Sequence, residues 1–582
     1  MQKDMASALA LAAATAFSPS TAHEVFLAQR GPHHGPGDRS FDVLTYDEEQ
    51  NLKVLGTSRT LSQLKDGGAG MSVVVLGAGV GGLTTAFQLL NDAKFDSVKV
   101  LEARDRIGGR CTTLRPGDSF TEMGPTFNVT QTVTFDQPKG DTAPYLNAGP
   151  GRIPSAHRDY INYAKLQGVP LELYQHTSYS NLVFDEGRFG DKPVVHRRLF
   201  YDSRGAFAAE LYAESSGDEE KQEWLREWGA LQSDGSYMGS SHSGYVKLPS
   251  TIEGVVEPPL PLKKMTKSKF WENDQGGFYH GDEFDQQPTS FQPVGGMDMI
   301  CHAFAKNIVA MGGEVLLSSP VTRVQKRPDG KWRVSYTAGG VADETLVADV
   351  VVSNIPLALL EGIVQQADFS AGYWAAFSNV FQAYHDGGAL TPATKVGWQS
   401  DRWYWQDPPD PNVVPIFGGI SWTTSEMTQM WYPSTAYHDK KGVLTGAYND
   451  GSLARRWGEM LPSERMAIAR AGAAQLHGDE FAEKLDHGLA IAWQNIPYLR
   501  GGWTSWSSVP DQLSTYNTFL KGEGNFYSVG DQNSLLSGWQ QGAVYAALSV
   551  VAQILELKHY RVVNSTKVPE PGPMGMAARH AG

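Results

Sequence analysis

The chain has little cysteine and lacks the short motifs of common hydrolases. Only two cysteines, Cys111 and Cys301, occur among its 582 residues. This number excludes a disulfide framework and a zinc site built on cysteines. The sequence also has no HExxH, CxxC or GxSxG pattern, so it gives no support to a metalloprotease or a serine hydrolase. We therefore expect no metal site.

Long apolar runs and an excess of positive charge are absent as well. No apolar run reaches the roughly 20 residues that a membrane-spanning helix needs. The net charge is −14, without a basic stripe to offset it, which argues against nucleic acid or a membrane as a partner. Residues 1–22 fit either an export signal or an amphipathic helix. The protein would be secreted or periplasmic in the first case and cytoplasmic in the second.

One stretch has the pattern of a dinucleotide-binding unit. The β-branched run 72–76 predicts a buried parallel strand, and 98–101 predicts a second one. Between them, Gly77-x-Gly79-x-x-Gly82 leads into a predicted helix over 83–90. The second strand ends at Glu102. This order of strand, glycine turn, helix, strand and acid is typical of dinucleotide binding.

Each part of this unit has a physical role. Gly77 allows the tight turn, Gly79 lets a pyrophosphate approach the backbone, and Gly82 lets the helix pack closely on the strand. The N-terminus of the helix supplies unpaired N–H groups and a partial positive charge. Glu102 follows Gly82 by 20 residues, where its carboxylate can accept both ribose hydroxyls and repel a 2′-phosphate.

Three later segments return to the same sheet. Strands are predicted over 313–317, 347–352 and 525–529, and the last of them ends in Gly530-Asp531. A nicotinamide domain usually completes its sheet in one block. Flavoenzymes of the glutathione-reductase type instead use a remote strand ending in Gly-Asp, so the pattern favours a flavin. The helix predicted over 538–557 would direct its positive end at the pyrimidine edge of that flavin.

The length of the chain implies two or three intertwined units. We expect an α/β protein with a discontinuous, Rossmann-like FAD-binding domain of glutathione-reductase type, a mixed-sheet substrate-binding domain and a helical region. The expected boundaries are 1–70 for an N-terminal arm, 71–155, 291–370 and 516–560 for the FAD-binding domain, 156–290 for the helical and substrate region, 371–515 for the substrate-binding domain, and 561–582 for a disordered tail. Further predicted elements are helices at 157–166, 206–228, 299–311 and 463–476 and a hairpin of 321–325 with 332–336.

Several segments together resemble the flavin amine oxidase superfamily, and within it the L-amino acid oxidases. They are Glu102 with Gly108-Gly109-Arg110, the GPxRxP segment 149–154, and the segments 294–298, 394–395, 431–433 and 530–539. These matches cover the chain from about residue 72 to 555 in the family's order. The doubled Gly-Pro, at 124–125 and again at 149–150, resembles the microbial branch that contains L-lysine and L-glutamate oxidases.

The resemblance implies a catalytic site. Arg152 would hold the substrate α-carboxylate by a bidentate pair, with Tyr432 donating from its hydroxyl. Lys395 would hold a water near flavin N5, and Trp539 would lie beside the flavin and the substrate amine. The implied reaction is oxidative deamination of an L-amino acid by hydride transfer from Cα to flavin N5. With O₂ and water it gives a 2-oxo acid, ammonia and hydrogen peroxide.

The same resemblance implies FAD as the cofactor. The residues expected to bind it are Gly77, Ala78, Gly79, Gly82, Glu102, Ala103, Arg104, Gly109, Arg110, Gly151, Arg152, Val321, Gly530, Asp531, Gly538, Trp539 and Gln540. Besides an L-amino acid and O₂, we expect a second copy of the chain as a partner, in a homodimer or higher homo-oligomer.

The preferred amino-acid side chain is left open by the sequence. Trp422, Trp431, Trp539 and the aromatic pair 278–279 suit large apolar or aromatic side chains, and we favour broad or aromatic specificity. The acidic run 282–285 fits a basic substrate or, more simply, a solvated loop. Three rival functions stay open: an amino-acid monooxygenase, an oxidase of polyamines or monoamines, and a flavin-binding protein without catalysis. Arg152 argues against an amine substrate without a carboxylate.

Overall fold

The computed structural model describes residues 68–555, apart from 92, 138–143, 187, 189–191, 268–288, 409 and 411–412. Nearly all of the expected N-terminal arm, the tail over 561–582, the aromatic pair 278–279 and the acidic run 282–285 lie outside the described residues. Within those ranges, no helix combines the length and apolar character that crossing a bilayer requires.

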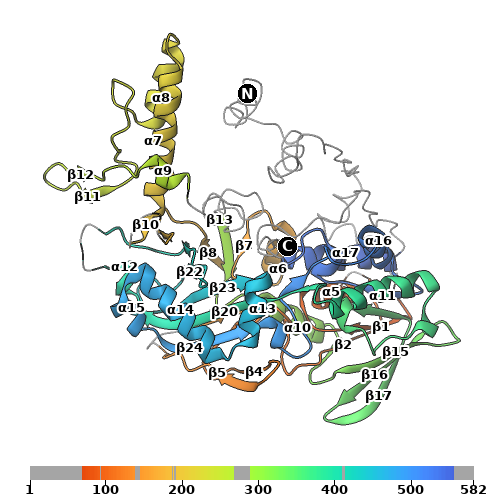
Figure 1. Cartoon of the computed structure of the whole chain (residues 1–582). Helices are drawn as coiled ribbons and strands as arrows, with labels where there is room; N and C mark the ends of the chain where they lie inside the picture. The colour runs from red at the N-terminus through yellow and green to blue at the C-terminus, as the bar shows by residue number, and fades with distance from the viewer. Residues whose placement is uncertain are drawn as a thin grey trace. The chain divides into compact units, whose positions relative to one another are not determined.

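A five-stranded parallel sheet forms the centre of the cofactor domain (Figure 1). Its order is β14 (Glu314–Leu316), β2 (Ser97–Leu101), β1 (Ser72–Leu76), β18 (Val350–Ser353) and β26 (Phe526–Ser528). The strands are short, and all except β26 are rich in valine and leucine, as expected where both faces of a sheet are covered. The predicted α/β class and the discontinuous Rossmann-like domain are therefore confirmed.

Alternate residues of β1 face two different cores. Val73 and Val75 pack into one apolar cluster with the helices α5 (Val80–Asn91), α6 (Arg158–Leu166), α10 (Met299–Ala310) and α17 (Gln540–Ile554). Val74 and Leu76 pack into the other, with α11 (Ala371–His385), α16 (Gln512–Lys521) and the antiparallel strands β15 (Val321–Lys326), β16 (Trp332–Ala338) and β17 (Val341–Ala348). This alternation follows from the two-residue period of a strand.

One strand prediction is wrong. The run 347–352 was expected as a single strand, but Asp349 divides it between β17, which pairs antiparallel with β16, and β18, which pairs parallel with β1. The Asp349 carboxylate accepts hydrogen bonds from the Ser72 backbone N–H at 2.9 Å and from the Ser72 hydroxyl at 2.8 Å. Apolar residues on both sides of Asp349 hide this break, because the sequence does not show that β17 pairs with the preceding β16 while β18 pairs with the distant β1.

A seven-stranded sheet forms the second large layer. Its order is β10 (Val194–Val195), β9 (Leu182–Phe184), β21 (Ile420–Thr423), β22 (Gln429–Trp431), β23 (Lys441–Asp450), β20 (Ala393–Asp401) and β24 (Asp486–Ala492). The helices α13 (Gly451–Glu459) and α14 (Pro462–His477) pack against it, and with the small helices α12 (Trp403–Gln406) and α15 (Asp479–Glu483) they enclose a third core.

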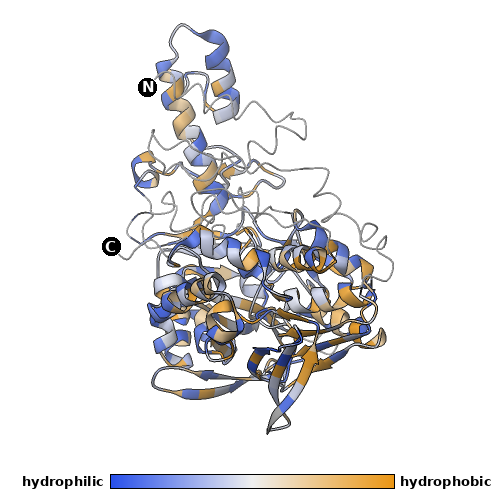
Figure 2. Ribbon diagram, turned by 90° about the vertical axis from the view of Figure 1, so that its right-hand side faces the viewer, coloured by the Kyte–Doolittle hydropathy of each residue, from blue (hydrophilic) through white to orange (hydrophobic). Residues whose placement is uncertain are grey.

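The region expected to be largely helical is mixed. The helices α7 (His196–Glu214) and α8 (Glu219–Gly229) pack on each other, and α9 (Leu262–Met265) packs on α7. The polar character of α8 is visible in Figure 2. The same region also supplies β8 (Leu171–Gln175), which joins β7 (Ile153–Pro154) and β13 (Thr289–Pro293) in a small sheet. That sheet holds the segment around Arg152.

Candidate active site

The glycine turn after β1 is shaped by close backbone approaches. Gly77 has φ +96°, and a Cβ on Gly82 would lie 2.1 Å from the Gly77 carbonyl oxygen. The absence of a side chain at Gly82 therefore allows α5 to pack closely on β1. A Cβ on Gly79 would lie 2.6 Å from the amide nitrogen of Asn354, which follows β18. A Cβ on Gly81 would lie 2.9 Å from the backbone nitrogen of Gly530, so this turn and the one after β26 touch.

Glu102 is fixed at the end of β2. Its carboxylate accepts hydrogen bonds from the backbone N–H groups of Ala78 at 2.8 Å and Arg104 at 2.9 Å. Burial raises the pKa of the Glu102 carboxyl, and these two hydrogen bonds oppose that rise. Each carboxylate oxygen keeps a further lone pair, so the group can still accept ribose hydroxyls. Ala78 and Arg104 thus orient Glu102 through their backbones.

One cavity runs from the glycine turn to the segment around Arg152. The predicted residues that line it are Gly77, Gly79, Glu102, Ala103, Gly109, Arg110, Gly151, Arg152, Val321, Lys395, Gly530, Asp531, Gly538, Trp539 and Gln540. Four predicted residues do not line it: Ala78, Gly82, Arg104 and Tyr432. Sequence reasoning missed Asn354, Tyr448, Trp493 and Trp503, which also line it. Of these, only Asn354 had a signal, because it ends a predicted parallel strand.

The far wall of this cavity offers polar atoms that need a ligand. Both amide atoms of Gln540, Nη2 of Arg110 and Nε1 of Trp503 are buried without a hydrogen-bond partner among the described residues. Nη1 of Arg110 contacts Asp531 Oδ1 at 3.0 Å, and Asp531 Oδ2 accepts from the Gly538 N–H at 3.2 Å. Gln540 is the first residue of α17, where a partial positive charge develops. These features fit an extended, polar cofactor with an electron-rich ring at the α17 end.

Arg152 lies at the end of the cavity between two indole rings. Its guanidinium carbon is 5.5 Å from the centroid of Trp431 and 5.5 Å from that of Trp539, and the residue is 1% exposed. Behind Trp539, the ring of His157 packs edge-on at 4.7 Å. Burial, and secondarily the charge of Arg152, lowers the pKa of His157 to about 3, so this support is neutral. The rings hold the guanidinium in place.

Lys395 lies beside Arg152 on β20. Its ammonium group donates to the backbone carbonyl oxygens of Asn147, at 3.1 Å, and of Gly149. Its Nζ is 4.9 Å from the Trp431 ring and 5.1 Å from the Tyr448 ring. Burial, and secondarily the neighbouring charge of Arg152, lowers the pKa of Lys395 to about 7. Its amine is therefore partly neutral at neutral pH.

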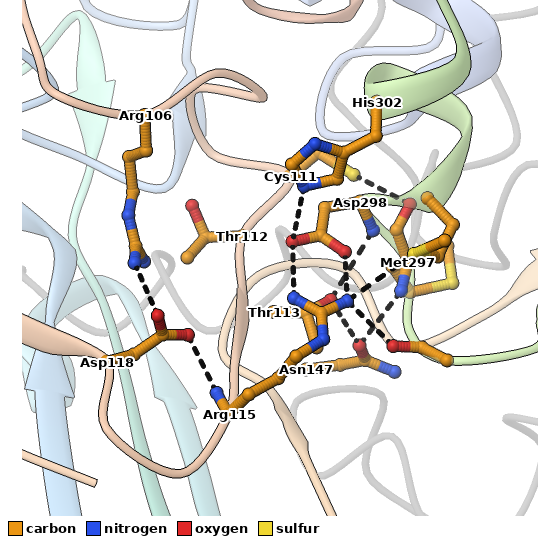
Figure 3. A network of polar contacts seen from close by, with 12 residues as sticks. Arg106, Cys111, Thr112, Thr113, Arg115, Asp118, Asn147, Met297, Asp298 and His302 are labelled. Atoms are coloured by element: carbon orange, nitrogen blue, oxygen red, sulfur yellow. Dashed lines mark hydrogen bonds and ion pairs between the residues drawn. The ribbon is translucent and has the colours of Figure 1, made fainter. Parts of the chain in front are cut away.

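A polar network holds the loop that presents Asn147 to Lys395 (Figure 3). Arg115 donates to both carboxylate oxygens of Asp298, at 2.6 and 3.0 Å, which ties the segment that follows β2 to the start of α10. The side-chain oxygen of Asn147 accepts from the Thr113 hydroxyl at 2.9 Å and from the Met297 N–H at 3.1 Å. Lys395 is thus positioned by two segments of the cofactor domain.

Tyr432, expected at the substrate carboxylate, does not line the cofactor cavity but belongs to the wall of a second cavity that adjoins it. Its hydroxyl contacts Ser421 Oγ at 2.8 Å and His477 Nε2 at 2.6 Å, inside the third core. Trp431 faces the cofactor cavity, so the next residue along the strand faces the other side of the sheet. Tyr448 of β23 lies on the cavity side instead. Trp422 packs into another apolar core and lines no part of the cavity.

We expect Tyr432→Phe to leave kcat/KM within about twofold of the wild type, while two lost hydrogen bonds cost about 1–2 kcal/mol of stability. Tyr448→Phe, the matched control on the cavity side, should lower kcat/KM about tenfold. It removes a hydroxyl that could donate to the expected substrate carboxylate, and a hydrogen bond to a charged group contributes about 1.5–3 kcal/mol. Steady-state kinetics and thermal unfolding of both variants check this. A large loss of activity in Tyr432→Phe at unchanged stability would restore its predicted role.

Comparison with known proteins assigns the family. Residues 80–555 match the family model of flavin-containing amine oxidoreductases. A putative L-amino-acid oxidase of Bacillus subtilis is 23% identical over 501 residues, which cover 83% of this chain and 95% of the relative. A flavin-dependent L-tryptophan oxidase of Lentzea aerocolonigenes is 23% identical over 515 residues, covering 83% and 97%.

Among solved structures, a cyclohexylamine oxidase from Brevibacterium oxydans has a similar fold. Its TM-score is 0.52 at 17% identity, and the match covers 84% of this chain and 99% of that one. The family match extends over most of the chain, and the cavity residues suit the cofactor of that family. The chain belongs to the flavin-containing amine oxidoreductases, and FAD is its cofactor.

Proposed function

We propose that the protein is an FAD-dependent L-amino acid oxidase. The observation that carries this proposal is the position of Arg152, a buried guanidinium between two indole rings at the end of the cofactor cavity. A guanidinium binds a carboxylate by two parallel hydrogen bonds, and burial strengthens that pair. An amine without a carboxylate would have no use for it. The names of the relatives in Bacillus subtilis and Lentzea aerocolonigenes support the same substrate class.

In this proposal Arg152 orients the amino acid, so that its Cα–H is directed into the cofactor cavity. Trp431 and Trp539 cover the guanidinium and exclude water from the pair. Tyr448, on the cavity side of β23, is placed to donate to the same carboxylate. FAD held along the cofactor cavity would supply the acceptor for the hydride from Cα and the route by which the electrons reach O₂ to give hydrogen peroxide.

In this proposal, Lys395 can accept a proton. Its Nζ donates two hydrogen bonds, to the Asn147 and Gly149 carbonyl oxygens. A neutral amine that donates twice keeps one lone pair, which can hold a water or accept the proton of the substrate ammonium. Because its pKa is about 7, this lone pair becomes available as the pH rises through neutrality. Among the β20 residues that line the cofactor cavity, Lys395 is the strongest base.

Anaerobic mixing with each of the twenty L-amino acids tests the proposal. We expect at least one of them to bleach the absorbance band of the oxidised flavin at about 450 nm. D-enantiomers and simple primary amines, which cannot use Arg152 in the same way, are the matched controls. If no L-amino acid bleaches the band in a protein with full FAD content, the proposal is wrong.

Product analysis then separates the oxidase from a monooxygenase. An oxidase converts the amino acid, O₂ and water to 2-oxo acid, ammonia and hydrogen peroxide. A monooxygenase that decarboxylates would form an amide and carbon dioxide without peroxide. We expect peroxide and 2-oxo acid in equal amounts after air is admitted to the reduced enzyme.

A further inference from the structure

A second cavity, of about 610 Å³, adjoins the cofactor cavity. Gly151, Lys395 and Trp431 belong to the walls of both, so the second cavity begins beside the reacting end of the first. A Cβ on Gly151 would lie 2.5 Å from the Trp431 ring, which shows how closely this partition is packed. An amino acid held by Arg152 has this second space available for its side chain.

A single row of residues crosses the small sheet into this cavity. In β13, Phe291 is opposite Ile153 of β7, and Gln292 is opposite Glu172 of β8. Continuing the β7 register by one residue places Arg152 beside Gln292. Arg152 and Glu172 therefore flank Gln292 in one row, two strand spacings or about 10 Å apart at Cα. Residues in such a row face the same side of the sheet.

Glu172 is a carboxylate without a counter-ion in the part of the chain that the structure describes. The amide nitrogen of Gln292 donates to it at 3.2 Å, and none of the ion pairs among the described residues includes it. Burial raises the pKa of Glu172, which is the sign of a carboxylate lacking compensating charge. Nearby, the buried hydroxyl of Tyr145 also has no hydrogen-bond partner among those residues. Both groups line the second cavity.

Of the cations that line this cavity, Lys395 lies at the partition with the cofactor cavity, and Arg402 and Lys441 lie farther along. Arg402 directly follows β20 and is seven residues beyond Lys395, or about 23 Å along an extended strand. Its Nε donates to the Lys441 carbonyl oxygen at 2.9 Å, and Lys441 pairs with Asp136 at 2.7 Å. Glu172 is therefore the carboxylate that the row presents to this cavity, and it has no ion-pair partner among the described residues.

We propose that Glu172, supported by Gln292 and Tyr145, selects L-amino acids whose side chain ends in an ammonium or guanidinium group. The inference rests on the proposed function, because it takes the α-carboxylate to be on Arg152. The side chains of L-lysine and L-arginine are long enough to pass Gln292 and end in hydrogen-bond donors. Apolar and aromatic substrate side chains, which the tryptophan content of the sequence suggested, would leave Glu172 and Tyr145 without hydrogen-bond donors or acceptors. This loss would weaken their binding.

Glu172→Gln tests this assignment because it keeps the shape and removes the charge. L-lysine is compared with L-norleucine, which has a similar chain without the ammonium, and with L-phenylalanine. We expect the wild type to favour L-lysine over L-norleucine, and the variant to lose about 10- to 100-fold of that ratio, mainly through KM. The kcat/KM for L-norleucine should be unchanged or higher. Glu361→Gln, which alters an exposed carboxylate paired with His385, is the charge-matched control.

The result that overturns the proposal is a wild-type preference for L-norleucine or L-phenylalanine, or an unchanged ratio in Glu172→Gln. The substrate ratio of the wild type decides the matter even if the variant does not fold. Either adverse result leaves bleaching of the flavin by an L-amino acid intact, so it is distinct from a failure of the proposed function. In that failure, no L-amino acid bleaches the flavin at all.

Discussion

Replacement of Arg152 by alanine is expected to lower kcat/KM for every L-amino acid substrate. Loss of one partner of a buried, hydrogen-bonded charge pair costs about 3–4 kcal/mol, which corresponds to about 10²- to 10³-fold. The factor should be similar for all side chains, because the α-carboxylate is common to all of them. The reductive half-reaction, followed by stopped-flow at several substrate concentrations, measures both the binding and the rate of flavin reduction.

Three controls separate this effect from damage to the fold. FAD content and the unfolding temperature show whether the space left between Trp431 and Trp539 collapses. Arg152→Lys keeps the charge but not the planar pair of donors, so it should recover only part of the loss. A primary amine without a carboxylate should react equally slowly with wild type and variant. Unaltered binding of L-amino acids by Arg152→Ala would remove the basis of the proposed function.

Gly81→Ala should yield protein largely devoid of FAD. The added Cβ would lie 2.9 Å from the Gly530 nitrogen and 3.1 Å from its Cα, and these backbone atoms cannot yield as a flexible side chain would. Separating the two turns displaces Asp531 and opens the cavity where both segments meet. We expect the ratio of flavin to protein absorbance after purification to fall at least about tenfold, a loss of more than about 1.4 kcal/mol of cofactor binding.

A second glycine serves as the control for this substitution. Gly372 lies in the first turn of α11, and a Cβ there would meet no atom within 4 Å. Gly372→Ala should therefore keep full FAD content and stabilise the protein by about 0.5–1 kcal/mol, since alanine favours a helix. If Gly81→Ala retains FAD as well as Gly372→Ala does, the contact between the two turns is not needed for cofactor binding.

The local part of the cofactor domain was predictable because its signals are local. Valine-rich strands, the turn from Gly77 to Gly82 and Glu102 all lie within about one βαβ unit, and each has one physical explanation. Contacts across the sequence were not predictable in the same way. Gly81 meets Gly530 only because β1 and β26 are neighbours of β18, which no pattern near Gly81 expresses.

The alternation of side chains along a strand explains why Tyr432 does not line the cofactor cavity. Trp431 and Tyr432 are adjacent in the motif, yet they lie on opposite faces of the sheet, and Tyr448 from a different strand lies on the cavity side. The tryptophans that suggested an aromatic substrate pocket have other packing partners. Trp431 and Trp539 pack on Arg152, and Trp422 is part of a core. Composition counts aromatic rings but does not say which face they cover.

The order of the central sheet also bears on how the protein is made. A ribosome releases β1 and β2 first, but the parallel strand β26, with Gly530-Asp531, follows only after the whole seven-stranded sheet has been synthesised. Until then the nascent cofactor domain has an open edge along β18 and lacks one wall of its cavity. Pairing of such distant strands is slow, and open edges invite aggregation. FAD loading is thus a late step in biogenesis, and flavin supply and chaperones should govern the yield of soluble protein.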